Sequence, residues 1–379
     1  MTRNEFAWSA ADHHAQKRGA AATWIASVCS WRGKARPLSL IATCGAIVMV
    51  GIAPEMVSLA RADAPAHECD RLAASAADPR RVAPGIDFDK IDVTRAIPAC
   101  EEALRLYPDE RRFTFQLGRA YQASPAPQRA LPLYEKLAAL GHGLAIISLG
   151  VMYGEGRGVA KDDSKAVKLF LEAARLGELL AMMNVAIAYE HGRGIRKDEN
   201  EAAEWFRKAA ERGHPVAMTR LGGFFENGRG VPRDPLEAVR WYRAAARTGD
   251  AAGMTQLANM YLRGEGVRRD ETEAANWFRR AADGGDPTAM FKLAELHVGG
   301  RGVERSPERA AQLIMRGLDT DGALTLDLLR PQARNWPPEL FAALQNRMHA
   351  AGAWVGPLDR TGSRTMSMVE HYVRMKERR

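Results

Sequence analysis

The sequence has few cysteines and none of the common motifs for catalysis or metal binding. Of its 379 residues only four are cysteines. No CxxC pair and no HExxH motif occurs, so a structural zinc site or a thioredoxin-type redox centre has no support. A Gly-x-Ser-x-Gly elbow is also missing, and no Gly-Lys-Ser/Thr follows a glycine-rich segment. We therefore expect no catalytic residue, no metal site and no cofactor, and we predict that the protein is not an enzyme.

Aromatic residues are scarce as well, at 7% of the chain, whereas glycine is frequent with 34 residues. This composition suits closely packed helices joined by glycine turns better than a β-sandwich, which needs many valine, threonine and tyrosine residues. The hydrophobic content of 46% is enough to bury a core over more than one structural unit. We expect an all-α protein.

The N-terminal region contains an apolar stretch that is too short for a typical membrane span. It runs from Leu38 to Ala53 and follows Arg32, Lys34 and Arg36. A spanning helix needs about 20 apolar residues, so this stretch suits the core of an export signal. Ala60 and Ala62 supply the small residues of a cleavage site, and we predict cleavage after Ala62. Residues 1–62 are thus a signal peptide or, alternatively, an uncleaved anchor that leaves the protein bound to the membrane. The charged region before the apolar stretch is unusually long for a signal, and a misassigned start codon is the other alternative.

Removal of this signal leaves two cysteines, Cys69 and Cys100. Two thiols in an oxidising compartment usually pair, so we predict a disulfide between them in a periplasmic or secreted bacterial protein. Two buried free thiols are the alternative if the protein is not exported.

The net charge of +8 includes basic residues that gather at the C-terminal end. Arg374, Lys376, Arg378 and Arg379 face few carboxylates there. A basic tail can meet phosphates, but a solvated chain end is the simpler interpretation. We expect no nucleic-acid partner.

The most informative pattern is a period of 36 residues that holds without an insertion from about Gly141 to Gly317. It gives five units. The glycines that open each unit are Gly141, Gly177, Gly213, Gly249 and Gly285. The glycine pairs inside each unit end at Gly158, Gly194, Gly230, Gly266 and Gly302.

Each unit is predicted to contain two helices. In the third unit an apolar stripe through Leu221 and Phe225 indicates a first helix from about His214 to Asn227. Gly228 ends this helix, and Asp234 caps the second helix. We expect three tryptophans of the second helices to fill the gaps between helices: Trp205, Trp241 and Trp277. A single helical pair cannot bury both faces, so the units must stack into an α-solenoid with a concave side.

The pattern A-M-x-x-L-G-x-x-Y-x-x-G-x-G-V-x-x-D-x-x-x-A-x-x-W-F/Y-x-x-A-A-x-x-G resembles the Sel1-like repeat (SLR) family, which is related to the tetratricopeptide repeats. The resemblance implies an adaptor or signalling scaffold, including roles in envelope regulation. Some secreted cysteine-rich members are linked to β-lactam binding or hydrolysis. This chain lacks their cysteine pairs in each repeat, so a β-lactam-interacting enzyme remains a remote alternative.

Other segments flank the five repeats, which we place at 142–317. Residues 63–108 are predicted to form an N-terminal arm and a capping helix, and 109–141 resemble a tetratricopeptide unit. A terminal helix and linker follow at 318–338. Residues 339–379 resemble a small peptidoglycan-binding domain through Leu344-Gln345, Met348, Gly352, Trp354, Gly356-Pro357 and Leu358-Asp359, but Arg360 and Ser363 replace expected glycines. This resemblance implies, as an alternative function, a factor that binds the cell wall.

The leading functional hypothesis is a non-catalytic periplasmic scaffold that binds a protein or peptide on its concave face, with peptidoglycan as the alternative ligand. We expect the first helices to line this face on the side opposite Leu221 and Phe225. Its mixture of apolar side chains and carboxylates would suit a partner with apolar and basic groups. The alternative is that the apolar members only pack against neighbouring helices. The candidate residues are Met183, Ile187, Glu190, Thr219, Glu226, Thr255, Asn259, Phe291 and Glu295.

Overall fold

The computed structural model describes residues 64–79, 81–332, 335–353 and 362–377. In these ranges the chain forms α-helices and two short 3-10 helices with no strand, which confirms the all-α solenoid. The predicted signal peptide and its cleavage residues Ala60 and Ala62 lie outside the described residues. Within the described part, no helix is both long and apolar enough to cross a bilayer.

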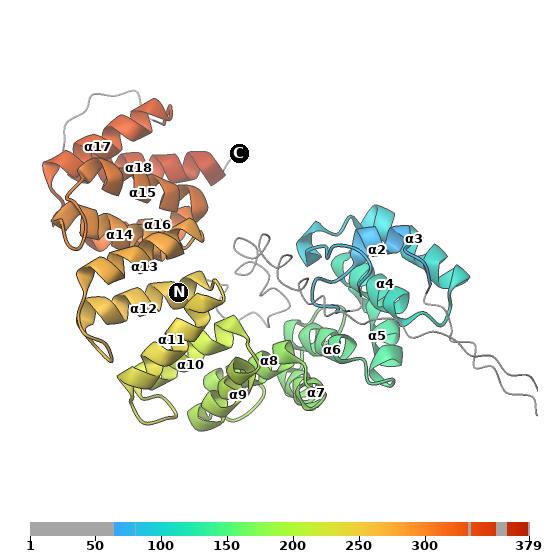
Figure 1. Cartoon of the computed structure of the whole chain (residues 1–379). Helices are drawn as coiled ribbons and strands as arrows, with labels where there is room; N and C mark the ends of the chain where they lie inside the picture. Colours follow the sequence, from blue (N-terminus) through green and yellow to red (C-terminus); the bar gives the residue numbers. More distant parts are fainter. Residues whose placement is uncertain (1–63, 80, 333–334, 354–361, 378–379) are drawn as a thin grey trace, which may run out of the picture.

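The five repeats form five pairs of helices of nearly equal length (Figure 1). The first helices are α6 (Gly143–Glu155), α8 (Leu179–His191), α10 (Pro215–Asn227), α12 (Ala251–Arg263) and α14 (Pro287–Gly299). The second helices are α7 (Asp163–Arg175), α9 (Glu199–Glu211), α11 (Pro235–Arg247), α13 (Glu271–Asp283) and α15 (Pro307–Thr320). Each first helix ends at a left-handed glycine, as predicted for Gly228, which has a φ of 68°.

The helices form two layers that curve into an open arc (Figure 1). Each first helix packs against the second helix of its own unit and against that of the preceding unit. Two successive first helices, α10 and α12, also contact each other directly, and α14 contacts the terminal helix α16 in the same way. In a curved double layer the elements of the inner layer lie closer together. The first helices therefore form the inner, concave layer.

Within a unit, a small residue of the first helix receives an aromatic ring of the second. A Cβ atom added to Gly150 would lie 2.5 Å from the Phe170 ring, and one added to Gly222 would lie 2.6 Å from the Tyr242 ring. Phe170 and Tyr242 are fully buried. Trp205, Trp241 and Trp277 are half-buried and pack against the edge of the core, in agreement with the prediction that they fill gaps between helices. The residue after each tryptophan lies in the core itself.

The second glycine of each loop locks one unit onto the preceding one. A Cβ atom on Gly230 would lie 2.0 Å from the carbonyl oxygen of Glu199, the first residue of α9. Gly194, Gly266 and Gly302 make the same close approach, each with a positive φ. Only glycine fits such a position. This repeated contact gives each unit the same position relative to the preceding unit.

Helices before and after the repeats close the two ends of the stack. At the N-terminal end these are α2 (Glu68–Ala73), η1 (Phe88–Lys90), α3 (Val93–Leu106), α4 (Arg111–Ala123), η2 (Pro127–Ala130) and α5 (Leu131–Ala138). At the other end, α16 (Gly322–Gln332), α17 (Pro338–Ala350) and α18 (Gly362–Glu377) pack on α14 and α15 and share their core. Gln345 and Thr365 form a buried hydrogen bond of 2.8 Å that joins α17 to α18. The residues from Trp354 to Asp359, which carry much of the peptidoglycan-binding resemblance, lie outside the described part.

Candidate binding surface

The structure buries several residues that we predicted to be exposed on the concave face. Met183 and Phe291 are 1% and 2% accessible, and Thr255 is 2% accessible. These residues and Thr219 are equivalent positions, 36 residues apart, and they face the next unit. Thr219 Oγ1 donates a hydrogen bond of 2.7 Å to Asp250, the capping residue of α12, and Thr255 does the same to Asp286. Met183, Thr255 and Phe291 are thus junction residues, and their prediction as exposed contacts is wrong.

The predicted carboxylates are all occupied by cations of the chain itself. Glu190 is 5% accessible, and its Oε1 lies 3.0 Å from Nη1 of Arg229. Glu226 pairs with Arg263, and Glu295 pairs with Lys292 at 2.9 Å. Glu226 also accepts a hydrogen bond of 2.6 Å from the Tyr242 hydroxyl, and burial together with this carboxylate raises the pKa of Tyr242. The prediction that these carboxylates are free to attract a basic partner is therefore wrong.

One line of the predicted residues remains accessible on the inner layer, besides Thr219 and Glu226, which are half-buried as well. This line contains Ile187, Asn259 and Glu295, which are half-buried. Beside it runs a second line that sequence reasoning missed, in which Arg220 is exposed and Gln256 and Lys292 are half-buried. Stepping by 36 from Arg220 reaches both of the others, so the signal was present in the repeat. We call these two lines the inner stripe: Asn184, Ile187, Arg220, Gly223, Gln256, Asn259, Lys292 and Glu295.

The N-terminal arm, residues 64–92, already occupies the equivalent positions on α4. The Cβ position of Gly118 meets the ring of Tyr134 just as Gly150 meets Phe170, which sets the register between α4 and α6. In this register Gln116 corresponds to Asn184 and Arg119 corresponds to Ile187. The stripe positions of α4 therefore bind the arm rather than solvent.

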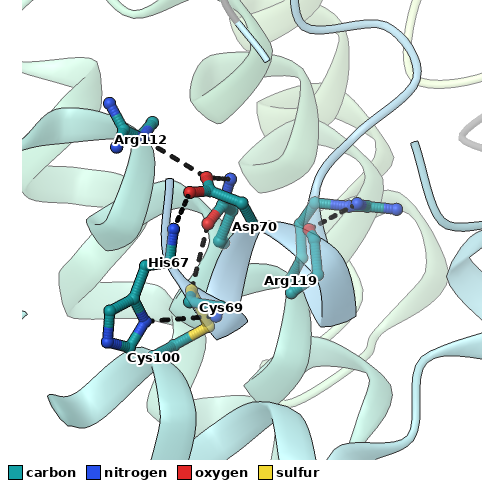
Figure 2. The surroundings of a disulfide bond; sticks show 8 residues. His67, Cys69, Asp70, Cys100, Arg112 and Arg119 are labelled. Atoms are coloured by element: carbon teal, nitrogen blue, oxygen red, sulfur yellow. Dashed lines mark hydrogen bonds and ion pairs between the residues drawn. A yellow bond between two sulfur atoms is a disulfide. The ribbon is translucent and has the colours of Figure 1, made fainter. Parts of the chain in front are cut away.

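Three long polar side chains of α4 make these contacts, mainly with main-chain carbonyls of the arm (Figure 2). Arg112 donates to the carbonyls of Ala64 and Pro65 at 2.6 and 2.8 Å, and its Nε donates to Asp70 at 3.2 Å. Gln116 Nε2 donates to the same carboxylate at 2.9 Å.

Arg119 binds the remainder of the arm. It donates to the carbonyls of Ala73 and Ile86 at 2.7 and 2.8 Å. Burial lowers the pKa of Arg119 to about 10, so its charge depends on these carbonyl dipoles for the solvation that water would supply.

A disulfide fastens the arm to the helix that follows it, which confirms the predicted pair. Cys69 of α2 and Cys100 of α3 are bonded, with their Cα atoms 4.7 Å apart, and neither is accessible (Figure 2). Sγ of Cys69 also lies 3.0 Å from Oε1 of Gln116. The covalent bond and the polar contacts of α4 therefore meet at the same place.

Where the arm ends on the inner layer, it leaves a small apolar cavity of about 60 Å³. Phe88 of the arm lies on one side, with Phe115, Ile147 and Leu180 of three successive first-type helices around it. The guanidinium of Arg157 lies 5.3 Å from the Phe88 ring, so the arm also contacts the loop of the first repeat. Asn184 is still buried, and the inner stripe is open from Arg220 onward.

Three histidines of the repeat region have structural positions. His142 and His214 are the capping residues of α6 and α10, and the Nδ1 of each accepts a hydrogen bond of 3.3 Å from a main-chain N–H. His297 Nδ1 lies 2.9 Å from the carbonyl oxygen of Glu304. Across the described residues, no group of three or more histidine, cysteine or acidic side chains is placed to hold a metal ion.

Comparisons with a family model and with solved structures both find Sel1 repeat proteins. The Sel1 repeat model matches residues 114–142, 143–178, 179–214, 215–250, 251–286 and 287–314, just over half of the chain, and so includes the segment that we compared with a tetratricopeptide unit. A Sel1 repeat protein from Oxalobacter formigenes is 32% identical, with a TM-score of 0.52 over 62% of this chain and 89% of that one.

A protective antigen of uropathogenic Escherichia coli with an SLR fold is 25% identical, with a TM-score of 0.56 over 73% of this chain. The match covers 64% of that antigen, less than two thirds of its length. No curated protein matches. The repeat model, together with these two structures, shows that the chain belongs to the Sel1 repeat family.

Proposed function

We propose that this protein is a non-catalytic scaffold that binds another protein along the inner stripe of α8, α10, α12 and α14. Sel1 repeat proteins generally mediate protein–protein interactions. The observation that carries the proposal is the open row of hydrogen-bonding side chains on the inner layer, with Arg220 exposed and Gln256 and Asn259 half-buried. The ends of the stack are covered by the chain itself, so the inner side of α10, α12 and α14 is the part of this layer left for a partner.

Site-specific photo-crosslinking from two positions of the same unit tests this proposal. A photoreactive residue replaces Gln256 on the inner layer or, as the matched control, Asn276 on the exposed side of α13. We expect a discrete crosslinked product in cells from position 256 and none from position 276. Equal products from both, or a product from position 276 alone, would contradict binding on the inner stripe.

We also propose that the scaffold works in the periplasm, in envelope regulation or signalling. The buried disulfide supports an oxidising compartment. Mass spectrometry of the mature protein tests the export step, since we expect its N-terminus to follow Ala62. A mature chain that still begins at Met1 would contradict cleavage. Sedimentation with purified peptidoglycan tests the cell-wall alternative, for which the scaffold proposal expects no enrichment of the protein in the pellet.

A further inference from the structure

Three leucines are exposed along one edge of the N-terminal units. Leu140 and Leu176 occupy the same position, 36 residues apart, at the C-terminal ends of α5 and α7, and Leu106 ends α3. Leu106, Leu140 and Leu176 are 49%, 49% and 53% accessible. Of the six large apolar side chains that are exposed in the described part, half therefore belong to this edge. We call these three residues the leucine row.

The turns that carry the leucine row lie along a single side of the solenoid. The two helices of a unit pack as an antiparallel hairpin, so each first helix begins at this side and each second helix ends at it. The loops with the glycine pairs lie along the opposite side, together with Leu236, the second residue of α11. Successive turns are one unit apart, so the leucine row follows the direction of stacking.

The repeat does not require leucine at this position. The equivalent residues of the later units are Arg212, Thr248 and Gly284, and those units pack on one another in the same way. The leucine row therefore does not serve the core, although the exposure of apolar groups to water is unfavourable. Apolar side chains that gather at one place on a surface are typical of an interface.

The surface around the leucine row is open. A Cβ atom added to Gly141, the neighbour of Leu140, would have no atom within 4 Å. Gly141 also has a positive φ, so the turn needs no side chain there that would shield the leucine. A second molecule can therefore approach this edge closely.

The two ends of the leucine row carry opposite charges. Arg212 is exposed and donates a hydrogen bond of 2.7 Å to the carbonyl oxygen of Gly177, so its guanidinium lies beside Leu176. At the other end, the exposed carboxylate of Asp109 follows Leu106 in the turn to α4. The apolar row thus has a cation at one end and an anion at the other.

A row of like residues with opposite charges at its ends is complementary to a copy of itself. A two-fold axis at Leu140 places this residue against the same residue of a second copy, and it places Leu106 against Leu176. The same rotation brings Arg212 of each copy to the end that carries Asp109 in the other. Such a contact is isologous and closes at two copies.

The size of the leucine row also favours a second copy over an unlike protein. Three half-exposed side chains cannot supply the roughly 800 Å² per partner of a standard interface. A symmetric contact forms each off-axis pair twice, so a short row gains more from its own copy than from an unlike surface. The small area predicts a weak dimer that dissociates on dilution.

We propose that two copies of this protein associate through the leucine row, about a two-fold axis at Leu140. The inner stripe is not part of this edge, so each copy keeps its own inner layer open. The inference goes beyond the scaffold function and does not depend on it. A dimer would present two inner layers, which strengthens the capture of a partner with two binding segments.

Sedimentation equilibrium of the exported protein over a range of concentrations tests the association. We expect the average mass to rise from that of one chain towards that of two, and no further. L140S/L176S should weaken the association about tenfold or more, because four apolar side chains are lost from the dimer. L236S is the matched control, because Leu236 is 52% accessible and lies on the opposite side. Thermal melting checks that each variant is folded.

Single added cysteines test the position of the axis. Cys69 and Cys100 are already bonded to each other, so an added thiol in the exported protein pairs with another molecule. Under mild oxidation, L140C should give a covalent dimer by itself, because residue 140 faces its own copy. L106C and L176C should crosslink in a mixture much better than either does alone. L236C should remain monomeric.

The mass of a single chain at every concentration, or a dimer that L140S/L176S does not weaken, would overturn the inference. A dimer that crosslinks through L236C and not through L140C would place the interface on the opposite side. A third contrary result is a monomer that binds phosphatidylglycerol vesicles and loses this binding in L140S/L176S, which would assign the leucine row to a membrane surface. Crosslinking from position 256 tests the scaffold function separately.

Discussion

Arg233 in the loop of the third repeat pairs with Glu265 in the loop of the fourth, with 3.2 Å between Nη2 and Oε2. At the other junctions the residue equivalent to Glu265 is an arginine. That arginine pairs with the acidic residue that begins the second helix of the preceding unit. Those pairs are Arg193 with Asp163, Arg229 with Glu199, and Arg301 with Glu271. In the third repeat the second helix begins with Pro235, and Glu265 takes its partner from the loop instead.

We expect E265R to lower the free energy of unfolding by up to about 1 kcal/mol, because the pair is partly exposed and the new cation would face Arg233. Adding P235E supplies the acidic residue present at other junctions and should recover most of the loss. Urea unfolding of the two single variants and the double variant measures the coupling. Strictly additive effects of E265R and P235E would show that the residues at positions 235 and 265 do not interact.

Replacement of Gly230 by alanine should strongly destabilise the stack. The new Cβ atom would lie 2.0 Å from a main-chain oxygen of the preceding unit, so the two units must separate. Gly213 is the matched control, because it also has a positive φ but has nothing within 4 Å of the added atom. G213A should cost only about 1 kcal/mol of backbone strain. Similar melting temperatures for the two variants would contradict the locking role of Gly230.

Removal of the disulfide by C69S/C100S should destabilise the N-terminal end by roughly 3 to 4 kcal/mol, the loop-closure value for residues separated by 31 positions. We expect hydrogen exchange to rise first in the arm and α4, while α10 to α14 keep their protection. Uniform loss of protection along the chain would show that the bond supports the whole stack instead. Thiol counting of the unmodified exported protein, denatured without reductant, should find no free thiol at these positions.

N184L should leave the melting temperature unchanged or raise it. Leucine has a similar volume and removes two unpaired polar atoms, whose burial costs about 1 to 3 kcal/mol. A large loss of stability would show that the amide has a structural partner in solution.

Burial raises the pKa of Asp286 in the folded state. A carboxyl group with a raised folded pKa holds its proton more tightly when folded, so its contribution to stability is present at low pH. That contribution is lost as the pH rises from the unfolded value of about 3.9 through the folded pKa. D286N stays neutral and can still cap α14, so its stability relative to the unmodified protein should increase between about pH 4 and pH 7. A difference that does not change with pH would contradict the shift.

The helices themselves were predictable from the 36-residue period. The expected first helix from His214 to Asn227 corresponds to α10, Pro215–Asn227, with His214 as its cap. The candidate face was less predictable, because a helical wheel assigns one buried and one exposed side. A first helix in this array is contacted by three neighbours, so Thr219 faces the next unit and Glu226 faces its own second helix. Only the side near Arg220 and Gly223 remains free.

The place of the arm could not be predicted from sequence. Residues 64–92 show no repeat period. Arg112 and Arg119 bind main-chain carbonyls of the arm, and every residue has such a carbonyl, so no sequence pattern could indicate these contacts. What could be predicted was the bond between Cys69 and Cys100, because it followed from the count of cysteines that remain after the signal.

Because similar units stack through the same two surfaces, the repeat itself does not determine how many units a stack contains. An uncovered final unit would present to a second molecule the same surface that each unit presents to its neighbour, and the contact would be head-to-tail and open-ended. Here α3 occupies that surface of α4 at one end, while α16 and α17 occupy those of α14 and α15 at the other. The terminal helices therefore fix the length of the array and keep a self-complementary repeat from growing into a filament.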